Sequence, residues 1–115
     1  MKRYCIVVEL KEEHIQEYID IHLNPWQELL EAIGNAGAKE LLIWNYRNLS
    51  IVYYECEDIN DIYRRLGNLE IVKNWNRVVE PWFDTQVTFS GKKEIPTCEK
   101  IFDLNQQLNG KLERY

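Results

Sequence analysis

The sequence predicts an α+β fold with the ferredoxin-like element order β-α-β-β-α-β. Its length of 115 residues is typical of a single domain. Stretches of β-branched and apolar residues alternate with stretches in which apolar residues recur every three or four positions. Proline and glycine residues fall between these stretches, where strands and helices end.

The first part of the chain is expected to hold a strand and a broken helix. "RYCIVVEL" (3–10) is apolar and β-branched, which is typical of a strand. A helical period begins at Glu12 and ends before Pro25, because a proline disfavours the α conformation of the residue that precedes it. That residue, Asn24, is expected to cap a second helix that closes near Gly37.

The middle of the chain is expected to form two strands. "KELLIWNYRNLSIVYYECE" (39–57) is rich in strand-forming residues and contains a short turn near Arg47 and Asn48. Large apolar residues occupy both alternation phases, so both faces of the sheet would be apolar. This suggests dimerisation or a pocket. The residues concerned are Ile43, Trp44 and Tyr46 in one strand and Val52, Tyr53 and Tyr54 in the next.

The last part should add two short helices and a fourth strand. Asp58 is expected to cap the first helix, which Gly67 stops. Asn68 should cap the second, which ends near Pro81. "CEKIFDL" (98–104) is interpreted as the final strand. We therefore expect one domain over residues 1–104 and a polar tail or arm over residues 105–115.

Composition excludes several partner classes. The chain is 45% hydrophobic and carries a net charge of -5, which argues against nucleic acid as the main partner. No apolar run approaches the roughly 20 residues that a membrane-spanning helix needs. Cys5, Cys56 and Cys98 form no CxxC pair, which is typical of reduced thiols in a cytoplasmic protein.

The two histidines differ in their setting. His14 follows Glu12 and Glu13 in a polar first turn, so a solvated position is expected. His22 comes four residues after Tyr18, on the apolar face of the same helix. It is either a core histidine hydrogen-bonded to backbone or a proton carrier with a pKa near neutrality.

Few other residues suggest chemistry. Trp75 lies on an apolar helix face and is either core or a flat wall for a sugar ring; Trp26 has the same two interpretations. There is no GxGxxG, P-loop or GxSxG motif. Two histidines without CxxC or HxxxH spacing do not indicate a zinc site. These patterns therefore give no motif for a nucleotide cofactor and no zinc site.

Several stretches resemble one known family. "EYIDIHLNPWQEL" (17–29) is similar to the first-helix motif of the L-rhamnose mutarotase family, in which a tyrosine, a histidine four residues later and Trp-x-Glu-Leu follow one another. "RNLSIVYYE" (47–55) resembles the second hairpin of that family, and "CEKIFDL" (98–104) its closing strand. "KRYC" (2–5) is similar to a subgroup often associated with L-fucose-type deoxysugar pathways. The resemblance extends to about Leu104.

This resemblance implies site residues. The catalytic histidine of the family falls on His22, and its sugar-binding tyrosine falls on Tyr18. Two adjacent tryptophans of the family fall on Asn74 and Trp75, and a further sugar-facing tyrosine falls on or near Leu41. The last four are the expected substrate-binding residues. The replacements at positions 41 and 74 remove groups that would recognise particular sugar hydroxyls.

The resemblance also implies a function. Members are small dimeric α+β-barrel proteins, so we expect a cytoplasmic homodimer that interconverts the α and β anomers of a 6-deoxy-L-sugar such as L-rhamnose or L-fucose. His22 would exchange the proton that ring opening and closure require, without cofactor or metal. Two alternatives stay open because fold alone does not decide function. One is a monooxygenase or haem-binding protein of the same fold, and the other is a non-catalytic sugar-binding or assembly domain.

Overall fold

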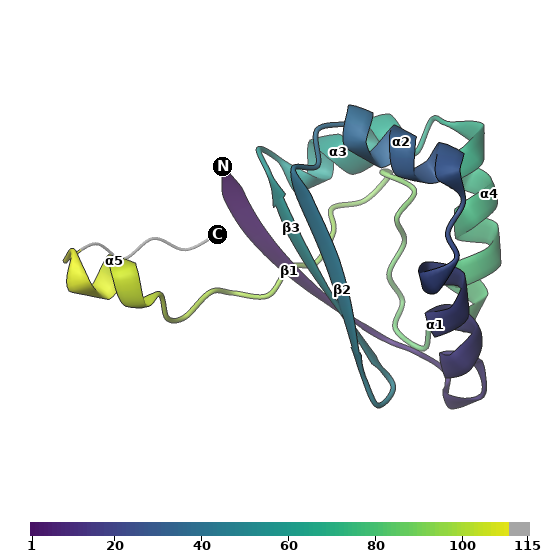
Figure 1. Ribbon diagram of the computed structural model, residues 1–115, viewed down its shortest axis with the longest axis horizontal. Helices are drawn as coiled ribbons and strands as arrows, with labels where there is room; N and C mark the ends of the chain where they lie inside the picture. Colours follow the sequence, from purple (N-terminus) through teal and green to yellow (C-terminus); the bar gives the residue numbers. More distant parts are fainter. Residues whose placement is uncertain (111–115) are drawn as a thin grey trace.

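The computed structural model describes residues 1–110. Three strands form one sheet, and helices precede and follow its hairpin (Figure 1). The strands are β1 (Lys2–Glu9), β2 (Glu40–Tyr46) and β3 (Leu49–Cys56). The α-helices are α1 (Ile15–Leu23), α2 (Gln27–Asn35), α3 (Ile59–Leu66), α4 (Glu70–Val79) and α5 (Leu104–Leu108), and short 3-10 helices cover Glu12–His14 and Glu80–Trp82.

The sheet is antiparallel, with the strand order β1-β3-β2. The predicted hairpin is confirmed, and its turn contains Arg47 at φ 54°, which lies in the left-handed region. Cys5 of β1 and Leu42 of β2 both pair with Tyr53 of β3, whereas Leu41 of β2 pairs with Tyr54. Because side chains alternate along a strand, Leu41 and Tyr54 share one face, and Cys5, Leu42 and Tyr53 share the other.

The two faces of the sheet have different surroundings. Helices α1 to α4 lie on one side of the strands in Figure 1, and the hydrophobic core fills the space between. Ile6, Val8, Val52, Tyr54 and Cys56 point into this core and are almost completely buried.

The face without helices is called the open face here. It consists of Cys5, Val7, Leu42, Trp44, Ile51 and Tyr53. Trp44 is 55% exposed, and Val7 and Leu42 are also exposed. The prediction that both faces carry apolar side chains is therefore confirmed, and one of them faces outward in the single chain.

Two asparagines end helices instead of starting them. We expected Asn24 and Asn68 to cap the helices that follow, but those helices begin after Trp26 and Leu69. Both asparagine side chains instead donate to a carbonyl of the preceding helix, Asn24 to Asp20 at 3.3 Å and Asn68 to Arg64 at 3.3 Å. The prediction of their capping role was wrong because an asparagine amide can donate to a helix end as well as accept at a helix start.

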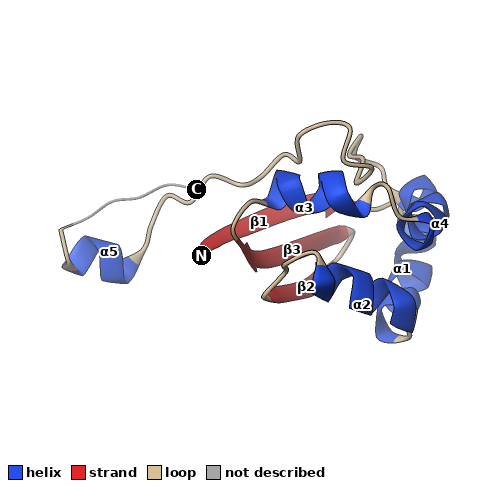
Figure 2. Ribbon diagram, turned by 90° about the horizontal axis from the view of Figure 1, so that it is seen from above, coloured by secondary structure: helices blue, strands red, loops and turns tan. Residues whose placement is uncertain are grey.

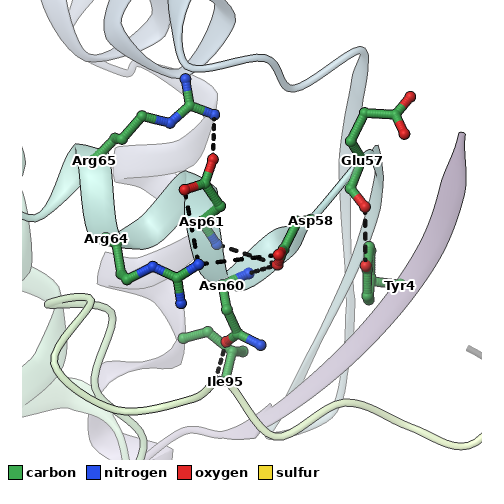
Figure 3. Close-up of polar contacts among 8 residues, drawn as sticks. All are labelled: Tyr4, Glu57, Asp58, Asn60, Asp61, Arg64, Arg65 and Ile95. Atoms are coloured by element: carbon green, nitrogen blue, oxygen red, sulfur yellow. Dashed lines mark hydrogen bonds and ion pairs between the residues drawn. The ribbon is translucent and has the colours of Figure 1, made fainter.

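The start of α3 agrees with the sequence. The Asp58 carboxylate accepts hydrogen bonds from the backbone N–H groups of Asn60 and Asp61 at 3.0 and 3.2 Å (Figure 3). The Asn60 side-chain oxygen accepts from the N–H of Ile95 at 2.8 Å, so the same turn also anchors the late loop. This confirms the predicted cap.

Two glycines let that loop approach α3 closely. A β-carbon on Gly67 would lie 1.8 Å from the Ser90 carbonyl oxygen, and one on Gly91 would lie 2.2 Å from the Tyr63 carbonyl oxygen. Gly91 also has φ +83°. No other residue type fits at either position without backbone movement.

The expected fourth strand is not formed. Residues 98–103 have no regular structure, and α5 begins at Leu104. The backbone N–H of Cys98 donates to the Cys5 carbonyl at 2.7 Å, but no ladder continues from it. The prediction of a strand over 98–104 was wrong because a strand depends on a pairing partner, which apolar composition does not supply.

The chain then runs away from the sheet to α5, as Figure 2 shows. Its large apolar side chains there are exposed: Ile101, Phe102, Leu104 and Leu108. The expected tail over 105–115 starts within α5, and residues 111–115 lie outside the described part of the chain. Within the described part, every helix is too short or too polar to cross a membrane.

Candidate active site

A cavity of about 450 Å³ lies between the helix-covered face of the sheet and the helices. It is lined by residues of α1 to α4, β2, β3 and the loop after α4. Most of its walls are apolar, which is typical of a site for a small organic ligand. The lining side chains used below are Tyr18, His22, Leu41, Asn45, Tyr54, Tyr63, Trp75, Asn76, Phe83 and Phe89.

His22 lies in the last turn of α1, and one of its ring nitrogens forms a hydrogen bond. Nδ1 is 2.7 Å from the carbonyl oxygen of Tyr18. A carbonyl only accepts, so Nδ1 carries the hydrogen and donates it. In the neutral ring, Nε2 then holds a lone pair, and within residues 1–110 it has no hydrogen-bond partner. The helix thus fixes both the tautomer and the orientation of the ring.

Burial lowers the pKa of His22 below its ordinary value of 6.5. The hydrogen bond to the Tyr18 carbonyl opposes this effect but is the smaller of the two. Burial acts this way because it penalises the charged imidazolium. The ring is therefore neutral at neutral pH, and its free nitrogen is able to accept a proton.

Tyr18 connects α1 to the sheet. It is 5% exposed, and its hydroxyl shares a 2.7 Å hydrogen bond with Ser50, the fully buried serine of β3. Its ring packs against the His22 ring, with centroids 4.2 Å apart. Burial raises the pKa of Tyr18, so the hydroxyl stays protonated. Tyr18 therefore holds the histidine through its carbonyl, its ring and its link to the sheet.

Trp75 forms the neighbouring wall of the cavity. Its ring meets His22 edge to face at 5.3 Å and Trp26 edge to face at 5.1 Å. Trp26 lies directly after Pro25, between α1 and α2. The break at Pro25 therefore brings a tryptophan against the same aromatic cluster that holds the histidine.

The structure brings four of the five expected site residues together. Tyr18, His22, Leu41 and Trp75 line the cavity. Asn74 does not: it is exposed, and its side-chain oxygen accepts from Arg77 at 2.6 Å. Successive helix residues point about 100° apart, so Asn74 and Trp75 face different surroundings.

Sequence reasoning missed several polar lining residues, namely Asn45, Tyr54, Tyr63 and Asn76. Helical spacing could have found Asn76, because it shares a face with Val72, Trp75 and Val79 at steps of three and four. Its amide nitrogen donates to the Phe89 carbonyl at 3.3 Å, which leaves its side-chain oxygen as an acceptor.

Tyr54 and Tyr63 form a hydroxyl pair. Their oxygens are 2.5 Å apart, and their rings meet edge to face with centroids 5.9 Å apart. Burial raises the pKa of Tyr54 to about 12 and holds that of Tyr63 well above its ordinary value. Both hydroxyls are therefore protonated at any working pH.

The cavity thus combines one neutral base, aromatic walls and a few hydroxyl and amide groups. This set suits proton transfer on a small polar molecule that also has an apolar face. Within residues 1–110, no group of three or more His, Cys, Asp or Glu side chains is arranged to hold a metal ion.

Comparisons with known proteins bear on the family and on the fold. The family model for L-rhamnose mutarotase matches residues 3–104. The crystal structure of L-rhamnose mutarotase FA22100 from Formosa agariphila is similar at 22% identity and a TM-score of 0.69, over 90% of this chain and 99% of that one. Tetracenomycin F2 cyclase from Streptomyces glaucescens, a type-II polyketide cyclase, is similar at 17% identity and a TM-score of 0.52, over 90% of this chain and 96% of that one.

At these identities the two structures bear on the fold alone, and they confirm the predicted ferredoxin-like α+β class. No curated protein sequence matches the chain significantly.

Proposed function

The chain belongs to the L-rhamnose mutarotase family, whose members are isomerases acting on carbohydrates, and from this premise we propose that it interconverts the anomers of a 6-deoxy-L-sugar such as L-rhamnose or L-fucose. The observation that carries the proposal is the placement of His22. Its tautomer is fixed by Tyr18, and it contributes a free nitrogen to a cavity of about 450 Å³.

The reaction requires one proton to move from the anomeric oxygen to the ring oxygen. Nε2 of His22 takes the proton of the anomeric hydroxyl, and the oxygen electron pair forms the C1=O bond of the aldehyde. The bond from C1 to the ring oxygen breaks, and that oxygen receives the proton back from the imidazolium. Rotation about C1–C2 and the reverse steps then close the ring on the other face. Atoms and charge balance, so one acid–base group is sufficient.

The aromatic walls suit the remaining parts of such a sugar. Trp75 offers apolar surface for the C–H groups and the methyl group of a deoxysugar. The Tyr18 hydroxyl shares one hydrogen bond with Ser50 and retains acceptor capacity toward a sugar hydroxyl. In this proposal Tyr18 orients both the base and the sugar.

Exchange spectroscopy by NMR tests the proposal. Magnetisation transfer between the α and β anomeric protons of L-rhamnose and of L-fucose is measured with the wild type and with His22→Ala. We expect transfer with the wild type for at least one sugar. The enzymatic rate should fall about 10²- to 10⁴-fold in the variant, which is the usual contribution of a general acid–base group.

His14→Ala is the matched control. It removes the other histidine, which pairs with Glu17 outside the cavity, and it should leave the rate unchanged. Equal rates for the wild type and a folded His22→Ala variant would refute the role of His22. Failure of the wild type to exchange either sugar would refute the function and favour a non-catalytic domain.

We also propose that the protein works as a homodimer in the cytoplasm. The open face presents apolar side chains, and β2 is an edge strand beside it. Such a surface is usually covered by a partner. The exposed apolar side chains of residues 101–108 offer further surface for a second copy. A cytoplasmic location is supported by the free thiols of Cys5, Cys56 and Cys98.

A further inference from the structure

We propose that the hydroxyl pair of Tyr54 and Tyr63 is a second polar subsite of the cavity, which binds a sugar hydroxyl away from the anomeric carbon and so selects among sugar isomers. This inference rests on the proposed function. It assigns a specificity role to two residues that take no part in the proton transfer.

Hydrogen-bond accounting is the first argument. Two phenol hydroxyls carry two hydrogens, and their mutual bond uses one of them. Within residues 1–110 the structure records no other hydrogen bond for either hydroxyl. One O–H donor and several lone pairs therefore stay available at the pair. A buried donor without a partner is costly, so the group needs a ligand or water.

The surroundings of the pair are the second argument. Both tyrosines line the same cavity as His22. The cross-strand neighbour of Tyr54 is Leu41, and the ring of Tyr63 packs against Phe89 with centroids 5.1 Å apart. Leu41 and Phe89 offer no polar side-chain atom, so the pair concentrates hydrogen-bonding capacity in an apolar part of the wall. An isolated polar group in an apolar pocket fixes the orientation of a ligand.

Separation from the base is the third argument. A row of ring contacts leads from His22 through Tyr18, Phe83 and Phe89 to Tyr63, at centroid distances of 4.2, 6.3, 6.0 and 5.1 Å. Along β3, Tyr54 lies four residues beyond Ser50, the partner of Tyr18, which is roughly 13 Å of strand. The pair is therefore set apart from His22 within the same cavity, so a sugar hydroxyl that it binds is one remote from C1 and not the anomeric hydroxyl.

The chemistry of the pair matches a sugar hydroxyl. A sugar hydroxyl donates one hydrogen bond and accepts others, and the pair offers both functions at one place. In the chain O–H(Tyr)···O–H(Tyr)···O(sugar), the free tyrosine hydrogen is donated to the sugar oxygen, and the chain is polarised along its length, which strengthens each bond. An isomer whose hydroxyl points elsewhere leaves the pair unsatisfied. Sites built around buried polar groups discriminate strongly for this reason.

The test compares L-rhamnose with its 2-, 3- and 4-deoxy derivatives. For each sugar, kcat/KM for anomeric exchange is measured by NMR with the wild type, Tyr63→Phe and the double variant Tyr54→Phe/Tyr63→Phe. We expect the wild type to disfavour one deoxy derivative. This discrimination should fall about two- to twelvefold in Tyr63→Phe, the equivalent of one hydrogen bond, and should vanish in the double variant.

Tyr4→Phe is the matched control. Tyr4 pairs with Tyr54 in the sheet register, and its hydroxyl donates to the Glu57 carbonyl at 3.4 Å outside the cavity. This variant should keep the wild-type discrimination. A folded double variant that discriminates as the wild type does would overturn the inference and leave the proposed function intact. If neither Tyr63→Phe nor the double variant folds, the pair is structural and the inference also fails.

Binding separates this inference from the proposed function. If the wild type exchanges no sugar, the same sugars are titrated and binding is followed by NMR line broadening. Binding that the double variant weakens, and Tyr4→Phe does not, would support the subsite in a protein without mutarotase activity. Undetectable binding of every sugar by the wild type would overturn both proposals.

Discussion

At the scale of single residues, the site depends on how one backbone carbonyl is used twice. Tyr18 and His22 are four residues apart in α1. The Tyr18 carbonyl therefore accepts a hydrogen bond from the His22 ring in addition to the backbone hydrogen bond of that helical turn. The imidazole is therefore oriented by main chain, which side-chain substitutions elsewhere do not remove. Side chains then adjust the basicity of the free nitrogen through burial.

The lowered pKa of His22 predicts the pH dependence of catalysis. The base works in its neutral form, so kcat/KM should reach half of its plateau value at a pH below the ordinary histidine value of 6.5 and level off as the pH rises. It should fall about tenfold per pH unit once the pH drops below the lowered pKa. The measurement is the exchange rate from pH 4.5 to 8, corrected for the uncatalysed reaction. A profile that is half-maximal at or above pH 6.5 would contradict the assignment.

Sequence patterns indicated some site residues and missed others for a physical reason. The four-residue step from Tyr18 to His22 is local, so spacing alone places both on one helix face. Asn74 came from resemblance, whereas the helical period favours Asn76, which lines the cavity. Tyr54 and Tyr63 meet only through the packing of α3 on β3, and no local sequence pattern predicts such a contact.

At the scale of elements, the positions where helices end were easier to predict than the residues that cap them. Pro25 and Gly67 separate two pairs of helices, as expected. Proline and glycine act through backbone sterics, which do not depend on the rest of the fold. Asn24 and Asn68 were misassigned because their side chains suit either side of a break. The strand expected over 98–104 depended on distant pairing, which lies beyond local patterns.

Two glycine substitutions should have opposite effects on stability. In Gly67→Ala, the new β-carbon would meet the Ser90 carbonyl, so we expect a loss of about 1–3 kcal/mol in the free energy of unfolding. Gly34→Ala in α2 meets nothing within 4 Å and should add about 0.5–1 kcal/mol. Urea unfolding followed by circular dichroism measures both. Equal effects of the two variants would show that the close approach at Gly67 is unimportant.

At the scale of the whole molecule, the cavity and the open face lie on opposite sides of one sheet. Each strand therefore serves two surfaces, because alternate side chains point to opposite faces. Leu41 and Tyr54 face the cavity, while Trp44 and Tyr53 face outward. A partner bound to the open face would contact the sheet behind the site without touching the ligand.

The proposed homodimer can be tested at the open face. The wild type should have a solution mass of twice 13.9 kDa, and Trp44→Glu should lower it to that of one chain. A carboxylate there would be buried without a partner, which strongly opposes association. Leu69→Glu, at an exposed apolar position on the helix side, is the control and should remain dimeric. Light scattering after size exclusion gives the masses, and a monomeric wild type would refute the proposal.

The wide spread of the cavity residues along the chain also bears on biosynthesis. The lining runs from Tyr18 to Phe89, and β1 pairs with β3 across some forty intervening residues. A ribosome adds residues in order at about 5–20 per second, so α1 and its histidine emerge seconds before Phe89 does. During that interval the hairpin of β2 and β3 is able to form, because it is local. The cavity is completed only when nearly the whole domain has left the exit tunnel. A stalled or truncated nascent chain would therefore contain His22 without the cavity in which it acts.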